Sequence, residues 1–345
     1  MPLLSQRPRG DICTEPLSAG KSRVRREKRQ MIIGIEDDFS LEKMADCGQC
    51  FRAVCLPDGS YRFISREKVL NIREQVPHQF QVSCSEEEWD EFWRDYFDLS
   101  RTYKRIREDL LLQLSGERTT PFGQTSRGIS EGDAATETAR RQGSIDPGER
   151  CIQGLDVGSD AAIRFLTQAE QAGRGLRILR QDPWEMLITF IISQRKNIPA
   201  IRLAVEKLAM LYGHPVKEML FTFPTPEELG RASEADLRTA GLGYRAPYVK
   251  DAADKVLSGA LDLEALGKLD DGALFEKLMT VKGVGKKVAN CICLFGFGRT
   301  SRAPVDVWIE RAITLCGGVD PFPAFGEYAG IMQQYAFYYM THQKM

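Results

Sequence analysis

The sequence lacks the features that mark membrane, exported or strongly cationic proteins. No apolar run approaches the roughly 18 uncharged residues of a membrane helix. The first thirty residues are polar and basic, without the apolar core of a signal peptide. The formal net charge is only −1, so any nucleic-acid binding would require a local basic face. These absences predict a cytosolic protein or, in a eukaryote, a nuclear one.

Cysteine is present, but in no arrangement typical of a metal site. The chain has nine cysteines, an odd number. Cys47 and Cys50 form a single C-x-x-C pair with no second pair and no nearby histidine. A compact four-cysteine cluster, as an iron–sulfur centre needs, is also missing near the chain end. We therefore predict reduced thiols and no metal.

Composition and periodicity predict an α+β protein with a small N-terminal antiparallel β-sheet domain and a larger, two-lobed helical domain. Strand-like segments on both sides of the Pro57-Asp58-Gly59 turn indicate a meander. A stretch rich in Gly, Ser, Thr and charge is expected to be an inserted, mobile loop. The predicted divisions are a disordered basic tail at 1–30, the β domain at 31–100, one helical lobe at 101–181 plus 290–345 with the insertion at 116–158, and a second lobe at 182–289.

Helical order is expected from about Ala161 to the end of the chain. Asp182 and Pro183 have the residue types of an N-cap and a first helical position. The segment that follows, WEMLITFIIS, is apolar on nearly all sides. This pattern predicts a central, buried helix.

A helical hairpin is predicted within residues 271–298. Leu274 and Val281 fit one face of a helix, and Gly283 and Gly285 permit positive φ at the turn that follows. A second helix starting at Lys286 would point its first amide N–H groups at a phosphate diester. Such contacts anchor DNA without reading its sequence. An ordinary helical hairpin without a ligand explains the same glycines.

Two residues near this turn are candidates for chemistry. Lys287 lies in the first helical turn, where the helix dipole and apolar neighbours are expected to favour its neutral, nucleophilic amine. Asp306 precedes an apolar-periodic helix and has the residue type of an N-cap. A rigidly held carboxylate beside a cleft can also stabilise positive charge that develops on a sugar. An exposed helix lysine and a purely structural cap are the alternatives.

The stretch KGVGKKVANCICLFGFGRTSRAPVDVW resembles the helix-hairpin-helix signature of base-excision DNA glycosylases, most closely the 8-oxoguanine DNA glycosylase family. In that family a lysine next to the hairpin is the nucleophile, and an aspartate in a Pro-Val-Asp stretch is its partner. The family pattern selects Lys287 over Lys286, and Asp306 follows at the family separation, 306 − 287 = 19.

Further segments resemble the base pocket and the DNA contacts of the same family. CGQCFR resembles the segment whose glycine carbonyl accepts the N7–H of 8-oxoguanine, and YAGIMQQYAF resembles the segment that completes the pocket. The implied base pocket consists of Gly48, Gln333 as the base-edge reader, Phe337 as a stacking face, and Cys291 on the other face. The implied DNA-binding residues are Arg195, Lys196, Asn197, Tyr244, Arg245, Gly283, Gly285 and Lys286.

The resemblance implies a TBP-like sheet domain and a bifunctional DNA glycosylase and abasic-site lyase. The enzyme would flip 8-oxoguanine out of duplex DNA, attack C1′ with Lys287 and cleave by β-elimination. It implies a monomer whose partner is double-stranded DNA containing oxidised guanine. It implies no cofactor, apart from a monovalent cation that the hairpin can hold. In a bacterium the protein would be associated with the nucleoid. Two alternatives remain: an alkylpurine (3-methyladenine-type) glycosylase on the same fold, and a non-catalytic DNA-binding protein.

Three positions depart from the family pattern. Ala200 replaces an arginine that eukaryotic members use to prefer a cytosine opposite the lesion, so we expect weaker opposite-base discrimination. Trp308 replaces a histidine that contacts phosphate, and Lys282 replaces the usual hairpin proline. These departures affect the DNA contacts and leave the two catalytic candidates in place.

Overall fold

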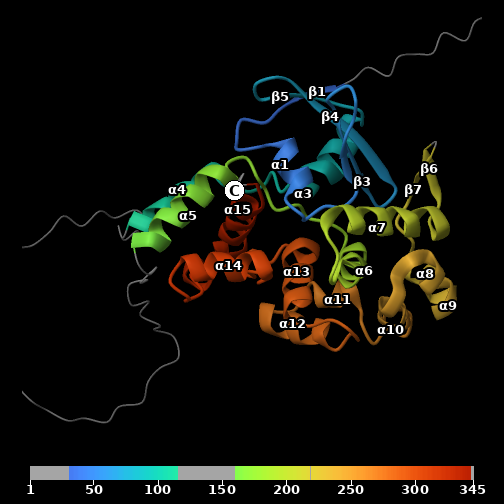
Figure 1. Ribbon diagram of the computed structural model, residues 1–345. Helices are drawn as coiled ribbons and strands as arrows, with labels where there is room; N and C mark the ends of the chain where they lie inside the picture. The colour runs from blue at the N-terminus through green and yellow to red at the C-terminus, as the bar shows by residue number, and fades with distance from the viewer. Residues whose placement is uncertain (1–30, 116–159, 218, 343–345) are drawn as a thin grey trace, which may run out of the picture.

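A computed structural model describes residues 31–115, 160–217 and 219–342 (Figure 1). The predicted disordered tail at 1–30 and the whole of the predicted insertion at 116–158 lie outside the described residues. The strands of the described chain are β1 (Met31–Gly34), β2 (Ala53–Cys55), β3 (Tyr61–Ser65), β4 (Lys68–Val76), β5 (Gln79–Val82), β6 (Pro215–Lys217) and β7 (Leu220–Phe221).

Helices make up most of the rest. The α-helices are α1 (Leu41–Asp46), α2 (Glu86–Glu88), α3 (Arg94–Tyr96), α4 (Tyr103–Ser115), α5 (Asp160–Gly173), α6 (Pro183–Ser193), α7 (Ile198–Tyr212), α8 (Pro226–Arg231), α9 (Glu234–Leu237), α10 (Ala246–Leu257), α11 (Leu263–Leu266), α12 (Asp271–Met279), α13 (Lys286–Phe297), α14 (Val307–Leu315) and α15 (Ala329–His342). Short π or 3-10 segments are η1 (Trp89–Trp93), η2 (Arg238–Leu242), η3 (Gly243–Arg245) and η4 (Phe322–Tyr328). None of the described helices is long and apolar enough to span a membrane.

The first five strands form one antiparallel sheet with the order β1-β5-β4-β3-β2. The predicted meander is confirmed: β2, β3 and β4 are consecutive neighbours, and the Asp58 carboxylate accepts from the Ser60 amide at 3.0 Å in the turn between β2 and β3. β1 pairs with β5 and closes the other edge. The predicted fold class, a small sheet domain followed by a larger helical region, is confirmed.

A small hairpin interrupts the helices that were predicted to run unbroken from Ala161 onward, so that part of the prediction is wrong. β6 and β7 pair antiparallel, and the Thr222 amide donates to the His214 carbonyl at 2.8 Å. Pro215 explains the break, because proline lacks an amide hydrogen and disfavours a helical residue before it.

The two parts of the molecule have separate apolar cores. The sheet core gathers Phe63, Trp93 and Phe97 under the strands. The helical core surrounds α6, in which every residue from Trp184 to Ser193 is buried. Asp182 caps α6 and Pro183 opens it, so the predicted central, buried helix is confirmed.

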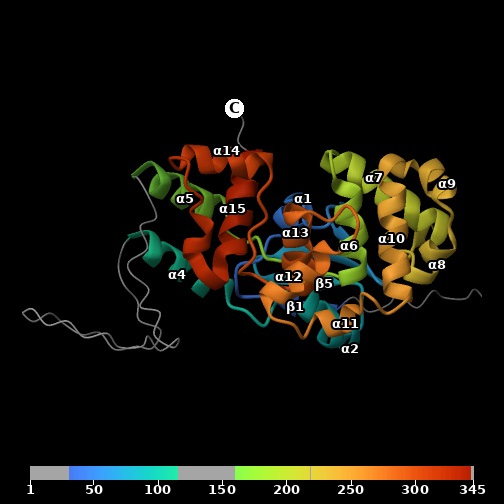
Figure 2. The ribbon, with the colours of Figure 1, turned by 90° about the horizontal axis from the view of Figure 1, so that it is seen from below.

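The helices form two groups with a central set between them. Figure 2 shows α4, α5, α14 and α15 on one side, α7 to α10 on the other, and α6, α12 and α13 between. One continuous core joins the two groups. The predicted lobe boundary between 289 and 290 falls inside α13, because that helix continues unbroken to Phe297.

An extended linker at 174–182 connects the sheet domain with the helical core. Its Arg177 is fully buried, and its guanidinium reaches the Asp37 carboxylate at 3.0 Å. The same side chain donates to the carbonyl oxygens of Asp38, Phe97, Asp98 and Arg101 at 2.7 to 2.9 Å. A buried charge with this many partners is stable only when they are in place, so Arg177 locks the linker onto the sheet domain.

Candidate active site

The turn between α12 and α13 is tight and needs glycine at one position. Gly283 has φ of +81°, and a Cβ there would lie 2.3 Å from the ring of Tyr248. The Val284 amide closes the turn on the Val281 carbonyl at 3.0 Å. Gly285 differs from the prediction: its φ is −96°, because it serves as the extended N-cap of α13.

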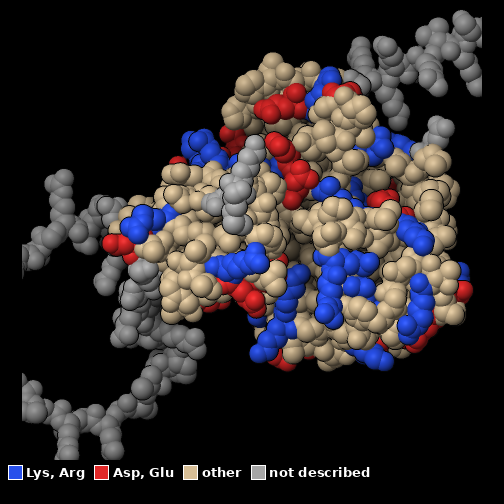
Figure 3. Space-filling view, viewed as in Figure 1, with Lys and Arg blue, Asp and Glu red and all other residues tan. Residues whose placement is uncertain are grey.

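The first turn of α13 faces outward with its amides uncapped by any side chain. Lys282 and Lys286 are exposed beside it. The Gln194 side chain donates to the Gly283 carbonyl at 3.1 Å and so fixes the turn to the end of α6. Figure 3 shows Lys and Arg side chains gathered over the lower, helical part of this face. The local basic face that nucleic-acid binding would require is therefore present.

A small cavity of about 40 Å³ lies behind this turn. All six residues predicted for catalysis and the base pocket line it, although they come from four separate parts of the chain. Sequence reasoning did not select the other five lining residues. The complete lining is Cys47, Gly48, Phe190, Lys287, Cys291, Phe295, Pro304, Asp306, Gln333, Gln334 and Phe337.

Lys287 is half-buried, one helical turn before Cys291. Its Nζ lies over the ring of Phe190, 5.5 Å from the centroid. Burial raises the pKa of the Cys291 thiol, whereas the adjacent Lys287 ammonium opposes that increase. Asp306 caps α14 as predicted, since its Oδ1 accepts from the amides of Trp308 and Ile309 at 3.0 Å each. Lys287 and Asp306 line one cavity without an ion pair between them.

Gly48 forms the wall across from α13. Its φ is +74°, and a Cβ there would lie 3.3 Å from both Ile198 and the ring of Phe337. The next residue, Gln49, is fully buried and fixes this loop to the linker. Its side chain donates to the Arg177 carbonyl and accepts from the Leu179 amide, both at 2.8 Å.

The predicted DNA contacts divide into exposed and buried residues. Arg195, with φ of +55°, Asn197 and Tyr244 are exposed, and Lys196 is half-buried. Asn197 also caps α7.

Arg245, also predicted to contact DNA, is instead buried at 6% exposure. It donates to the Gln194 carbonyl, and its guanidinium lies 4.3 Å from the centroid of the Tyr244 ring. The reason is packing: the Arg245 side chain lies inside the fold, against the ring of Tyr244.

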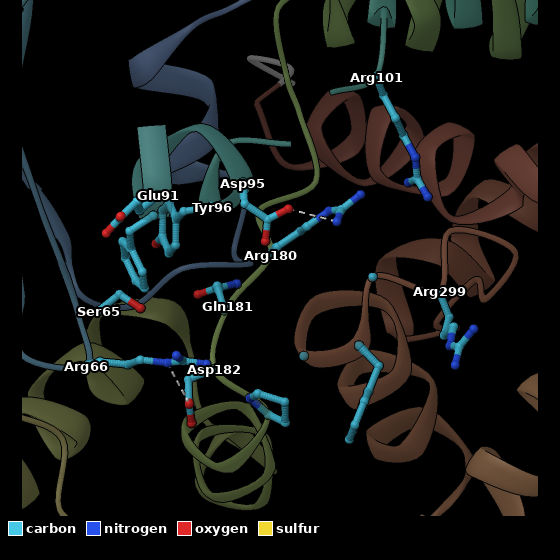
Figure 4. A pocket seen from close by; sticks show the side chains of 15 residues that line it. Ser65, Arg66, Glu91, Asp95, Tyr96, Arg101, Arg180, Gln181, Asp182 and Arg299 are labelled. Atoms are coloured by element: carbon cyan, nitrogen blue, oxygen red, sulfur yellow. Dashed lines mark hydrogen bonds and ion pairs between the residues drawn. The ribbon is translucent and has the colours of Figure 1, made fainter. Parts of the chain in front are cut away.

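A larger cavity of about 580 Å³ lies at the opposite end of α13, where Gly296 and Gly298 contribute to its wall. Lys287 is nine residues earlier than Gly296, or about 13 Å along the helix. Figure 4 shows Arg66, Arg101, Arg180 and Arg299 around this space. Each forms an ion pair with an aspartate at 2.9 to 3.6 Å. This cavity is thus separate from the Lys287 site, and its charges are largely neutralised. No group of three or more His, Cys, Asp or Glu in the described ranges could hold a metal.

Comparison with known proteins places the chain in a class and then in a family. Residues 188–329 match the HhH-GPD superfamily of base excision DNA repair proteins, and residues 31–129 match the N-terminal domain of 8-oxoguanine DNA glycosylase. A structure of MBOgg1 in complex with a low-affinity DNA ligand is 31% identical, with a TM-score of 0.72 over 90% of this chain and 95% of that one. The chain belongs to the 8-oxoguanine DNA glycosylase family of that superfamily.

Two further relatives agree with this assignment. The 8-oxoguanine glycosylase/lyase of Clostridium acetobutylicum, in complex with double-stranded DNA containing cytosine opposite 8-oxoG, is 28% identical with a TM-score of 0.71, over 91% of this chain and 99% of that one. The N-glycosylase/DNA lyase of Saccharomyces cerevisiae is 38% identical over 41% of this chain and 42% of its own length. The chain spans about half the length of the first curated relatives that it matches.

Proposed function

We propose that this protein is a bifunctional DNA glycosylase and abasic-site lyase that removes 8-oxoguanine from duplex DNA. The observation that supports it best is the single cavity in which Lys287 and Asp306 meet Gly48, Cys291 and the α15 side chains. A nucleophile, a fixed carboxylate and side chains that can contact both faces of a base are the parts that excision of an everted base requires.

The reaction follows from these groups. After losing its proton, the amine of Lys287 attacks C1′ of the deoxyribose, forming a C–N bond as the glycosidic bond breaks and the base leaves with its electron pair. The carboxylate of Asp306, held by two backbone amides, stabilises the positive charge that develops on the sugar. Opening of the sugar ring then gives a protonated imine. Loss of a C2′ proton expels the 3′ phosphate by β-elimination.

The base would enter only after the cavity widens. A volume of about 40 Å³ accommodates roughly one water molecule, far less than a purine. Phe337 is the wall that we expect to move, because its ring is half-buried whereas the other two lining phenylalanines, Phe190 and Phe295, are buried. Rotation of that ring would expose the Gly48 carbonyl to the N7–H of 8-oxoguanine and place the ring on one face of the base, opposite Cys291.

The DNA would lie across the basic face as a duplex, bound by one protein monomer. Uncapped amides of α13, with Gly283, Gly285 and Lys286, would anchor phosphates through partial and full positive charge. Tyr244 and Asn197 would fill the gap left by the everted nucleotide, while Arg195 and Lys196 would approach the opposite base. No cofactor is needed; a monovalent cation at the hairpin carbonyls would assist phosphate binding.

Borohydride trapping tests the function directly. Wild-type protein should become covalently linked to duplex DNA containing 8-oxoguanine, because borohydride reduces the imine. Lys287→Gln should abolish the link, whereas Lys286→Gln, which removes an exposed neighbouring charge, should still form it. Asp306→Asn should slow base release by at least about tenfold.

Base release without trapping would instead support the alkylpurine glycosylase, which uses a water nucleophile. Absence of any release from 8-oxoguanine duplexes, with DNA binding retained, would support the non-catalytic DNA-binding protein. Trapping by Lys287→Gln would show that the assigned nucleophile is wrong.

A further inference from the structure

Gln334 is a lining residue of the Lys287 cavity that family resemblance did not point to. It follows Gln333 on α15, and the two side chains are 4% and 2% exposed. Its Nε2 donates to the Oε1 of Gln333 at 3.1 Å. Its own Oε1 is buried and accepts no hydrogen bond from the described residues. Eight buried side-chain atoms of the described residues lack a partner, and the Oε1 of Gln334 is the one whose residue lines the Lys287 cavity. An unpaired buried acceptor in a cavity wall calls for an explanation, and a ligand group that donates to it would provide one.

The hydrogen bond between the two glutamines determines which of their groups stay free. The Oε1 of Gln333 is occupied by its neighbour, so the Nε2 of Gln333 remains as a donor. The Oε1 of Gln334 remains as an acceptor. The pair therefore presents one donor and one acceptor from adjacent residues of one helix, both toward the same cavity.

The donor of Gln333 and the acceptor of Gln334 are complementary to the pairing edge of guanine and not to that of adenine. Along its pairing edge a guanine derivative presents the O6 acceptor next to the N1–H and N2–H donors. An adenine derivative presents the reverse, a donor at position 6 and an acceptor at N1. We propose that Gln334 is a specificity-determining residue: its Oε1 accepts from N1–H or the 2-amino group of the everted base while Gln333 donates to O6. This inference rests on the proposed base-excision function.

The chemistry also predicts what an adenine derivative would lose. Its amino group would face the Nε2 donor of Gln333, and its bare N1 would face the Oε1 acceptor of Gln334. The first pair is donor against donor and the second is acceptor against acceptor. The facing polar groups would therefore be buried without hydrogen bonds. Sites that leave buried polar groups unpaired reject such analogues strongly. The glutamine pair thus selects guanine-derived lesions by hydrogen-bond order, in addition to the Gly48 carbonyl that would read oxidation at N7.

Single-turnover kinetics on three matched duplexes test the inference. They contain 8-oxoguanine, 8-oxoadenine or a preformed abasic site at the same position. The abasic duplex serves as the reference, because its cleavage requires Lys287 but offers no base to read. For Gln334→Leu, which keeps the side-chain volume without an acceptor, the rate on 8-oxoguanine relative to the abasic duplex should fall about tenfold or more. The preference for 8-oxoguanine over 8-oxoadenine should shrink by a similar factor.

Gln334→Asn is the matched variant, because its shorter side chain keeps both the amide acceptor and the amide donor, and it should retain the preference for 8-oxoguanine. Thermal unfolding of both variants shows whether a rate change reflects folding. Suppose that the wild type excises 8-oxoguanine and that Gln334→Leu leaves the rate on 8-oxoguanine, relative to the abasic duplex, unchanged. The specificity role is then refuted and the proposed function stands. An 8-oxoadenine preference in the wild type would mean that the amides present the opposite order and would also refute it. If the wild type releases no base, the proposed function itself fails.

Discussion

The two walls of the Lys287 cavity are built in different ways. On one wall, Lys287 and Cys291 are a helical turn apart on α13, and Asp306 caps the next helix. The opposite wall combines Gly48 with Gln333, which are 333 − 48 = 285 residues apart. Local helix rules position the first wall, whereas the second exists only when the sheet domain, the linker and α15 pack together. The wall that carries Lys287 should therefore tolerate distant changes that would disrupt the wall formed by Gly48 and Gln333.

The largest expected effect comes from removing the support of the Gly48 loop. Gln49→Ala leaves the Leu179 amide and the Arg177 carbonyl buried without their side-chain partner. Each unpaired group costs about 1–3 kcal/mol, so we expect the free energy of unfolding to fall by about 4 kcal/mol. Urea denaturation measures it, with the exposed Gln75→Ala of β4 as a control that should change little. An unchanged midpoint for Gln49→Ala would mean that the linker does not hold this wall.

The next largest effect is a change in the free energy of unfolding that depends on pH through Glu185, a buried residue of α6. Burial raises the pKa of Glu185 from 4.5 to about 7, against the opposing influence of Arg52. Between these two values the folded protein holds a proton that the unfolded chain releases, so this residue's contribution to stability is lost as the pH rises through that window. Glu185→Gln keeps the shape without the charge and should be more stable than the wild type by roughly 3 kcal/mol at pH 8.

The same comparison made at pH 4.5 serves as the control for Glu185→Gln. There the wild-type carboxyl is protonated and resembles the amide, so the two unfolding midpoints should nearly coincide. Thermal unfolding across pH 4.5 to 8 measures the difference. A stability advantage that is constant over this range would show that Glu185 does not titrate within it.

The smallest expected effect concerns the turn before α13, in the wall that carries Lys287. Gly283→Ala places a methyl group against Tyr248 at a residue with positive φ, and should cost about 2 kcal/mol of unfolding free energy. Gly285→Ala is the matched control: its φ is negative and no atom lies within 4 Å of the added Cβ. It should cost about 1 kcal/mol or less. Equal costs for the two substitutions would contradict the observed turn geometry.

The features that depend on short stretches of chain, including much of the wall that carries Lys287, could be predicted from the sequence. The start of α13 at Lys286 and the caps at Asp182 and Asp306 follow from short-range rules, because an N-cap side chain bonds amides two or three residues away. Gly285 was misjudged, since a glycine before a helix can serve as an extended cap as readily as a positive-φ turn residue.

Other features depend on contacts that no short stretch encodes. Arg245 looks like an exposed DNA contact in the sequence, but the carbonyl that holds it belongs to Gln194, at the far end of another helix. Gln334 carries no local signal in the sequence, because its place in the cavity wall and its unpaired Oε1 result from the surrounding fold. The β6–β7 hairpin was missed because two short strands produce little periodicity.

The sequence by itself determined the fold class, the central helix and the starts of α6, α13 and α14, since these depend on apolar spacing and on caps within a few residues. Its family motifs also named six of the eleven residues that line the cavity. Only the tertiary structure brought Gly48, Lys287 and Gln333 to one space, and it alone closed that space to the size of a water molecule. The physical reason is that burial and long-range hydrogen bonds, such as those of Gln49 and Arg177, arise from packing between segments far apart in the chain.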